Sequence, residues 1–133
     1  MKEKCSCGCE TRTSCDCNCL SYGKGKHGIT ACIESLGGDV VLRIGGGQKP
    51  HAGCVVICEP DEASGNATTP VHTFTTHREE AVARPIAESL CRKTGSRVVC
   101  VCGIHVENAG KKDIALLVKN AKELGKRILN AFD

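Results

Sequence analysis

Residues 44–53, which read IGGGQKPHAG, combine a flexible backbone with positive charge and a histidine. The glycines at positions 45–47 lack a Cβ atom and can adopt backbone angles that are closed to other residues. Successive N–H groups in such a segment can form a concave anion-binding site, called a nest. Lys49 adds positive charge, and His51 can donate or accept a hydrogen bond or bind a metal. We therefore expect an anion-binding loop here, with a glycine-rich hairpin turn as the alternative.

Other polar residues are expected near the same edge of the fold. His77 lies in the first turn of a predicted helix. His105 lies at the carboxyl end of a buried strand, and Asn108 follows it. Ligands of open α/β sheets gather at the carboxyl ends of the strands. Together with His51, these histidines could bind a metal or could hydrogen-bond a phosphate at the helix N-terminus. The full set of candidate ligand-binding residues is Arg43, Gly45, Gly46, Gly47, Lys49, His51, Thr76, His77, His105 and Asn108.

The first 19 residues contain six of the twelve cysteines, in two C-x-C-x-C clusters. Alternate residues of an extended chain lie about 6.6 Å apart on one side, so the thiols of each cluster can converge. Thiolates bind zinc and copper(I) and hold iron–sulfur clusters. We expect residues 1–26 to be a tail that binds a thiophilic metal, with incidental thiols or disulfides as the alternative. The proposed ligands are Cys5, Cys7, Cys9, Cys15, Cys17 and Cys19.

The other six cysteines lie in apolar segments, where cysteine is usually a small buried hydrophobic residue. The N-terminal lysines are not followed by the apolar segment of a secretory signal, which favours a cytoplasmic protein with reduced thiols. These cysteines are Cys32, Cys54, Cys58, Cys91, Cys100 and Cys102.

Hydrophobic periodicity predicts five strands and two helices in the order ββββαβα. The first three strands should form an antiparallel meander. Thr76 and Glu79 fit a capping box for the first helix, and Pro85 should kink that helix or start a second one. The predicted strands are 27–35, 39–45, 52–59, 70–75 and 97–106, and the predicted helices are 76–95 and 111–131.

These elements indicate an α/β fold over residues 27–133, which we expect to form a single domain. The fold class is a two-layer sandwich in which two main helices lie on one face of a mixed five-stranded sheet. The other face of the sheet needs cover, which a homodimer would supply.

Composition and motifs exclude several classes of function. The formal net charge is +3 and aromatic residues make up 2% of the chain, so nucleic acid is not an expected partner. No apolar segment reaches 18 residues, so no membrane helix is expected. The chain has no G-x-S-x-G or H-E-x-x-H motif, which favours binding over catalysis and argues against an enzyme.

Two alternative functions remain open from the residues alone. The first is a metal-dependent enzyme that activates water at a site formed by His51, His77 and His105, with Glu107 as the acid/base partner. The second is a thiol-based metal carrier or redox sensor that works through the cysteine-rich tail.

Three segments together resemble a known family: RIGGGQKPHAG, THREEAVARPIAESL and VVCVCGIHVENA. The resemblance is to the LpdD-type small subunit associated with gallate decarboxylase, also described as a prenylated-flavin chaperone-like domain, and it covers residues 28–130. It implies a small dimeric α/β protein, similar in fold to proteasome-assembly chaperone domains.

The same resemblance implies a cofactor and two partners. The cofactor is prenylated FMN, or FMN itself, and the partners are a UbiD-type decarboxylase and a flavin prenyltransferase. The protein would shelter the oxidation-prone reduced cofactor and pass it to the apo-decarboxylase. We expect the flavin phosphate to lie on the glycines beside Lys49, with His51, His77, His105 and Asn108 near the phosphate or the ring edge.

Overall fold

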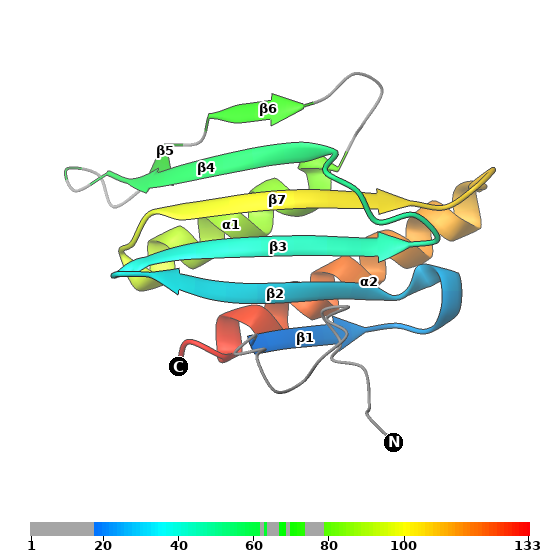
Figure 1. The fold of residues 1–133 in the computed structure, drawn as a ribbon, viewed down its shortest axis with the longest axis horizontal. Coiled ribbons are helices and arrows are strands. Elements are labelled where there is room, and N and C mark those ends of the chain that lie inside the picture. Colours follow the sequence, from blue (N-terminus) through cyan, green and yellow to red (C-terminus); the bar gives the residue numbers. More distant parts are fainter. Residues whose placement is uncertain (1–17, 62, 64–66, 69, 74–78) are drawn as a thin grey trace.

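A mixed β-sheet is covered on one face by two helices (Figure 1). The structure is a computed structural model that describes residues 18–61, 63, 67–68, 70–73 and 79–133. The elements are β1 (Asn18–Tyr22), the short 3₁₀ helix η2 (Gly25–His27), β2 (Ile29–Leu36), β3 (Asp39–Gly47), β4 (Cys54–Pro60), β5 (Ala67–Thr68), β6 (Val71–Thr73), α1 (Glu80–Thr94), β7 (Val98–His105) and α2 (Lys111–Asn130).

The strands follow the order β1-β2-β3-β7-β4-β5, and β6 pairs with β4. β3 and β7 run parallel, whereas the other strand pairs are antiparallel. The predicted α/β fold, with a mixed sheet and two helices on one face, is confirmed. The sheet contains more strands than the five predicted, because β1 lies in the segment assigned to the tail and the two-residue β5 was not predicted.

β7 lies between β3 and β4, so the predicted meander is wrong at that pair, although β2 and β3 do form an antiparallel hairpin. The composition of β7 explains its position. Val98, Cys100 and Cys102 are fully buried against the helices, and Val99 and Val101 on the other face are partly buried. A strand that is apolar on both faces is most stable at the centre of a sheet.

Alternate residues of the central strands point toward the helices and form the core. From the sheet, Leu42, Ile44 and Val56 are at most 2% exposed, and Leu90 of α1 and Leu124 of α2 meet them from the helical layer. The period of two in the strands and the 3- and 4-residue spacing in the helices therefore produce the two-layer packing that the sequence predicts.

Five cysteines of the domain are buried free thiols, as predicted: Cys54, Cys58, Cys91, Cys100 and Cys102. Burial raises the pKa of the Cys100 thiol far above its ordinary value. A hydrogen bond from Cys102 lowers the pKa of Cys54, while the same contact, followed by burial, raises the pKa of Cys102. Four of these thiols lie on β4 and β7, where they pack as small hydrophobic residues.

The sixth domain cysteine departs from this prediction. Cys32 forms a disulfide with Cys19, and the Cα atoms of the two residues are 4.1 Å apart. The two residues lie directly opposite each other in the antiparallel pair of β1 and β2, which brings the two sulfur atoms together. Cys19 is therefore not available as a metal ligand in this structure, which corrects its assignment. The other proposed tail ligands, Cys5 to Cys17, lie outside the described residues, and metal binding by them stays a prediction.

Helix α1 begins later than predicted. Its N-cap is Glu79, whose side chain makes no capping hydrogen bond, so Glu79 does not play the part expected of it in a capping box. Thr76 lies outside the described residues. Pro85 lies inside one helix from Glu80 to Thr94, so the prediction that it starts a second helix is wrong. Gly95 ends α1 in a left-handed conformation, as predicted.

Candidate functional site

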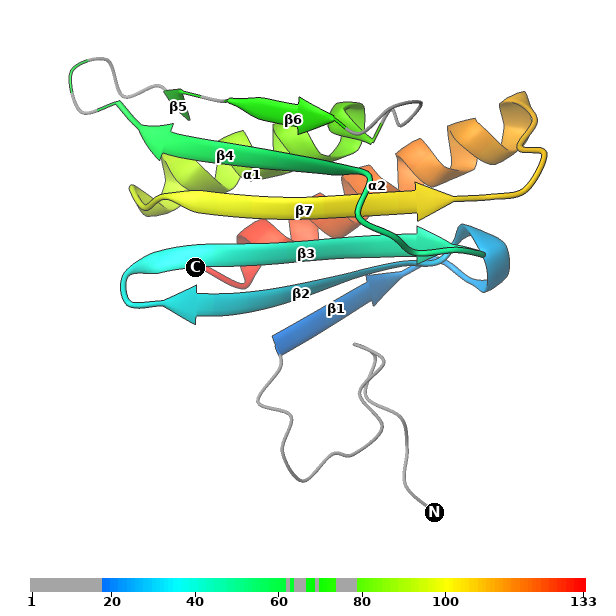
Figure 2. The ribbon, with the colours of Figure 1, turned by 45° about the horizontal axis from the view of Figure 1, so that its top comes forward.

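The connection from β3 to β4 has to cross β7, and it does so on the face of the sheet that the helices leave uncovered, here called the open face. Figure 2 shows this connection passing in front of β7. The main chain of His51 lies directly on Gly103, where an added Cβ would overlap the His51 carbonyl group. Pro50 packs on Gly45 in the same way, and a Cβ there would lie 3.2 Å from the proline ring. These glycines let the connecting segment lie directly on strands β3 and β7.

The three glycines of the opening motif are strand residues rather than a loop. Gly47 pairs with His105 of β7, its φ angle is 76°, and a Cβ at this position would overlap the His105 carbonyl oxygen. The N–H of Gly47 donates to Gly28, and those of Gln48 and Lys49 both donate to the carbonyl of His105. The predicted nest of free N–H groups is therefore wrong at these positions, and so is the alternative of a hairpin turn.

His51 is held between two acceptors. Its Nδ1 lies 2.9 Å from the carbonyl oxygen of Lys49, and its Nε2 lies 3.1 Å from Oε1 of Glu79. Because a carbonyl can only accept, Nδ1 is the donor in the first bond, and Nε2 then shares a proton with the Glu79 carboxylate. The Glu79 side chain is only 8% exposed, which makes this contact a well-shielded polar pair.

Glu79 is the main residue of the site that the sequence did not identify. Its Oε1 also lies 3.4 Å from the N–H of Ile104, and its carboxylate packs against Gly53, where a Cβ would lie 2.7 Å from Oε2. The same glutamate therefore touches β7, the crossing segment and the first turn of α1. In the sequence, Glu79 stands out only by its three-residue spacing from Thr76, which fits a capping box.

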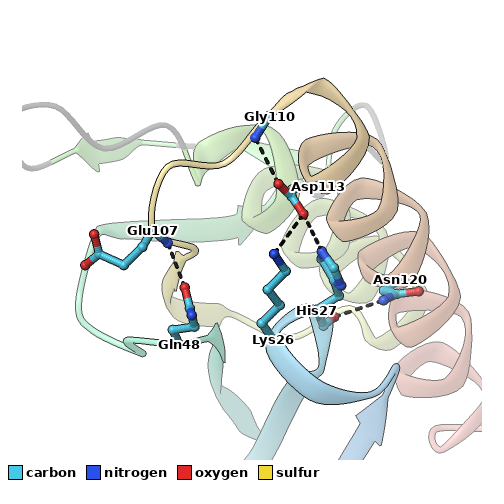
Figure 3. A network of polar contacts seen from close by, with 7 residues as sticks. All are labelled: Lys26, His27, Gln48, Glu107, Gly110, Asp113 and Asn120. Carbon is cyan, nitrogen blue, oxygen red and sulfur yellow. Dashed lines mark hydrogen bonds and ion pairs between the residues drawn. The ribbon is translucent and has the colours of Figure 1, made fainter.

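A second polar cluster lies at the carboxyl end of β7. The ammonium group of Lys49 lies 2.6 Å from the carboxylate of Glu107, and Nε2 of His105 lies 3.6 Å from the same oxygen. Lys49 lowers the pKa of Glu107, with a smaller contribution from His105. The backbone N–H of Glu107 donates to the Gln48 side chain at 2.8 Å, a contact drawn in Figure 3. This cluster ties the turn after β7 to the end of β3.

A hollow on the open face, here called the open-face pocket, lies beside the crossing segment. Four segments of the chain line it, chiefly through Thr30 and Cys32 of β2, Arg43 and Gly45 of β3, Pro50 and His51 of the crossing segment, and Val101 of β7. Arg43 lies between Cys32 and Val101 in the sheet register. Within the described residues, Arg43 has no ion-pair partner, so its charge is available to a ligand.

The structure brings some predicted residues together and leaves others apart. Arg43 and His51 line the open-face pocket, as do Gly45, Gly46 and Gly47. The rings of His51 and His105 lie 6.3 Å apart, because the parallel strands β3 and β7 end at one edge. Lys49 and His105 lie beside the pocket and engage Glu107, and Asn108 is exposed in the following turn. Thr76 and His77 lie outside the described residues.

The chemistry of the open-face pocket suits a flat anion. Arg43 presents a planar guanidinium group with five donors, and Thr30 adds a hydroxyl that lies 2.8 Å from that of Ser21. Glycine backbone and the side chains of Pro50 and Val101 supply flat apolar surface. Among the described residues, no group of three or more His, Cys, Asp or Glu side chains could hold a metal ion. In the same part of the chain, no helix is long and apolar enough to cross a membrane.

Two known proteins share features with this chain. Protein LpdD of Lactiplantibacillus plantarum is 23% identical over 100 residues, which cover 75% of this chain and 74% of the relative. A chain in the crystal structure of a chaperone complex for yeast 20S proteasome assembly superposes with a TM-score of 0.61, over 88% of this chain and 94% of that one. At 14% identity this likeness shows the fold alone, and it confirms the predicted similarity to proteasome-assembly chaperones.

A family model gives the assignment. The model described as the prenylated flavin chaperone LpdD-like domain matches residues 23–133, which include the whole open-face pocket and leave out the cysteine-rich segment before it. The chain therefore belongs to the prenylated flavin chaperone LpdD-like family, and it is an accessory protein rather than an enzyme.

Proposed function

We propose that this chain binds prenylated FMN in the open-face pocket and delivers it to a UbiD-type decarboxylase. The observation that carries the proposal concerns Arg43, which has no ion-pair partner within the described residues. It lies beside the fixed ring of His51 in a hollow lined largely by glycine and aliphatic surface. Family membership supports the choice of a prenylated flavin over other flat anions.

Side chains, not a backbone nest, are the groups that hold the phosphate in this proposal. The guanidinium group of Arg43 can donate two parallel hydrogen bonds to a phosphate, and such charge-assisted bonds are the stronger kind. The ring of His51, whose two nitrogens are held by Lys49 and Glu79, forms a fixed edge of the pocket beside the phosphate. Thr76 and His77 lie outside the described residues, and their part in binding the phosphate stays a prediction from the sequence.

The isoalloxazine ring of the flavin then lies on the sheet. With aromatic residues at 2% of the chain, stacking on a ring is not the expected mode. The apolar surface formed by Pro50 and Val101 can pack against the ring by dispersion and by exclusion of water. His105 and Asn108 lie beyond the crossing segment and are proposed to approach the polar edge of the ring.

A homodimer would complete the shelter around the cofactor. On the open face, Ile57 is 46% exposed, and Val41, Val55 and Val99 are only partly buried. A second copy packed on this face would bury those side chains and enclose the flavin between two sheets. Exclusion of oxygen and water from the reduced cofactor is the expected benefit.

Anaerobic co-expression with a flavin prenyltransferase tests the proposal. The purified protein should carry one prenylated FMN per chain, identified by its absorbance spectrum and its mass, and apo-decarboxylase should become active when mixed with it. Residues 18–133 should bind flavin as well as the full chain. A chain that takes up no reduced prenylated FMN at micromolar concentrations would contradict the proposal.

The Cys19–Cys32 disulfide favours a second candidate function, thiol-based redox sensing. Cys32 forms part of the pocket wall beside Arg43, so the state of its sulfur bears on the ligand site. Formation of the bond removes two electrons and two protons from the thiols, and an oxidised low-molecular-weight disulfide would accept them. Alkylation and mass analysis after equilibration in glutathione buffers tests this candidate. If Cys19 and Cys32 stay reduced over the whole physiological range of glutathione redox potential, redox sensing by this pair is excluded.

A further inference from the structure

A groove on the outer side of the helical layer, here called the α1–α2 groove, is separate from the open-face pocket. It runs between the two helices and is lined mainly by Val82 and Pro85 of α1 and by Ala115, Val118 and Leu129 of α2. Near one end the helices meet closely, because a Cβ at Gly125 would lie 3.1 Å from Ile86. Figures 1 and 2 show both helices on one side of the sheet, the side opposite the crossing segment.

The floor and one lip of this groove are apolar and exposed to solvent. Val118 is 39% exposed and Ile114, one helical turn earlier on the same face of α2, is 53% exposed. Among the described residues, five large hydrophobic side chains are exposed, and Ile114 and Val118 are the two that lie on this face of α2. Exposed apolar surface with a polar rim is typical of a protein interaction site.

The rim of the groove is positively charged. Lys119 and Lys122 line it and have no ion-pair partner within the described residues, while Lys126 lies 3.2 Å from Glu123 at the surface. By contrast, Arg84 of α1 is neutralised by Glu80 and Glu88 of its own helix. The α1–α2 groove is therefore an apolar channel beside unpaired ammonium groups. Its complement is an apolar helix or strand that carries carboxylates.

Pro85 adds a polar feature to the wall. Because proline has no N–H, the carbonyl of Ala81 receives no hydrogen bond from the residue one turn later, and both residues line the groove. A partner that inserts a donor at this point can bond to that carbonyl. The α1–α2 groove thus offers an apolar floor, cationic groups and an acceptor, which are the contacts that an amphipathic segment of a protein uses.

We propose that the α1–α2 groove docks an acidic amphipathic segment of the decarboxylase that receives the cofactor. This inference rests on the proposed function, which requires the chain to meet that enzyme. If a second copy covers the open face, the helical layer is the surface that remains for a different partner. Docking there holds the loaded chaperone at the enzyme and raises the local concentration of the cofactor.

Binding of the flavin-free chain to purified apo-decarboxylase, measured by biolayer interferometry, tests the proposal. The double variant Val118→Glu/Lys122→Glu places two negative charges on the groove, and we expect its Kd to rise about ten-fold or more. A matched control, Leu36→Glu/Lys24→Glu, makes the same change in net charge at exposed positions away from the groove, and its Kd should stay within about two-fold of the parent value. The affinity of the parent for the decarboxylase should decrease when the salt concentration is raised from about 0.15 M to about 0.5 M, because salt screens the attraction between the lysines and the carboxylates.

Several outcomes would overturn the inference. One is a groove variant that binds the decarboxylase as tightly as the parent, and another is a parent that does not bind it. Loss of self-association, or loss of binding to anionic lipid vesicles, in place of the loss of decarboxylase binding would assign the groove to another occupant. Circular dichroism and flavin uptake should match the parent in both variants, which shows that the fold and the open-face pocket are intact.

The two proposals fail in different ways. In one case neither the parent nor any variant takes up flavin, but the groove variant loses decarboxylase binding. The proposed function is then wrong and the docking surface stands. If all variants load flavin and none loses decarboxylase binding, the docking surface is wrong and the flavin site stands.

Discussion

His51 and Glu79 form a shielded polar pair, with 3.1 Å between Nε2 and Oε1, although 28 positions separate them in the sequence. The pair joins the segment that crosses β7 to the start of α1. Since Nδ1 of His51 is fixed by the carbonyl of Lys49, the ring cannot rotate without loss of both contacts. The pair therefore fixes one wall of the open-face pocket.

Replacement of Glu79 by glutamine should weaken this wall. The amide cannot share a proton with Nε2 in the same way, and we expect the free energy of unfolding to fall by about 1–3 kcal/mol, with a parallel loss of flavin affinity. Urea denaturation and flavin titration measure the two effects. The control is Glu80→Gln at the next residue, which removes only a solvent-exposed pair with Arg84 and should change stability much less. Equal effects of both substitutions would contradict the assigned role of Glu79.

Addition of one methyl group at Gly103 should displace the crossing segment. A Cβ there would overlap the His51 carbonyl group, so the Gly103→Ala variant must shift main chain against main chain. We expect a loss of about 3 kcal/mol in unfolding free energy and a fall in Tm of about 10 °C. The control is Gly38→Ala, since no atom lies within 4 Å of a Cβ at that position. Differential scanning calorimetry on both variants makes the comparison, and a Gly103→Ala variant as stable as the control would be inconsistent with the described crossing.

Much of the fold follows from patterns that act within one element. The alternation in β2 and β3 and the helical stripe of α2 predict those elements nearly to the residue. The convergence of the glycine segment and His105 at one edge also follows, because parallel neighbours end together, and Gly47 does pair with His105. The same logic brings the rings of His51 and His105 near each other.

The predictions that proved wrong concern contacts between residues that lie far apart in the sequence. Gly45 and Gly103 show that something approaches the backbone closely, but only the order of the strands reveals that it is the segment of Pro50 and His51. That order could not be read from turn lengths, because β7 enters between two strands that precede it in the chain. The disulfide of Cys32 likewise depends on β1, which lies inside a segment with no clear apolar alternation.

Arg43 provides the sharpest test of the open-face pocket. Its side chain is exposed and lies on the face away from the core, so Arg43→Ala should leave Tm nearly unchanged while Kd for prenylated FMN rises about ten-fold or more. Arg43→Lys should recover only part of the affinity, because an ammonium group lacks the planar fork of donors. As a control, Arg97→Ala removes an exposed arginine that pairs with Glu59 and lies outside the pocket. Equal affinity of Arg43→Ala and Arg97→Ala would exclude the pocket as the phosphate site.

Asp113 should make the acid stability of the domain depend on its contact with η2. Figure 3 shows its carboxylate bonded to His27, to the N–H of Gly110 and to Lys26. The contact with His27, followed by that with Gly110, lowers the pKa of Asp113 from 3.8 to about 2. Because the pKa in the folded state is depressed, this contribution to stability is complete above the unfolded value and is lost as the pH falls toward 2.

The Asp113→Asn variant should therefore be less stable than the parent near neutral pH, and the gap should narrow between about pH 4 and about pH 2. Urea denaturation at a series of pH values measures that gap. His27→Asn removes the first partner of Asp113, so the pKa of Asp113 returns toward its ordinary value. The gap in stability between this variant and the double variant His27→Asn/Asp113→Asn should therefore narrow less over the same pH range. If the stabilities of the parent and the Asp113→Asn variant stay a constant distance apart over this range, the carboxylate does not hold η2 to α2 in the manner that the structure describes.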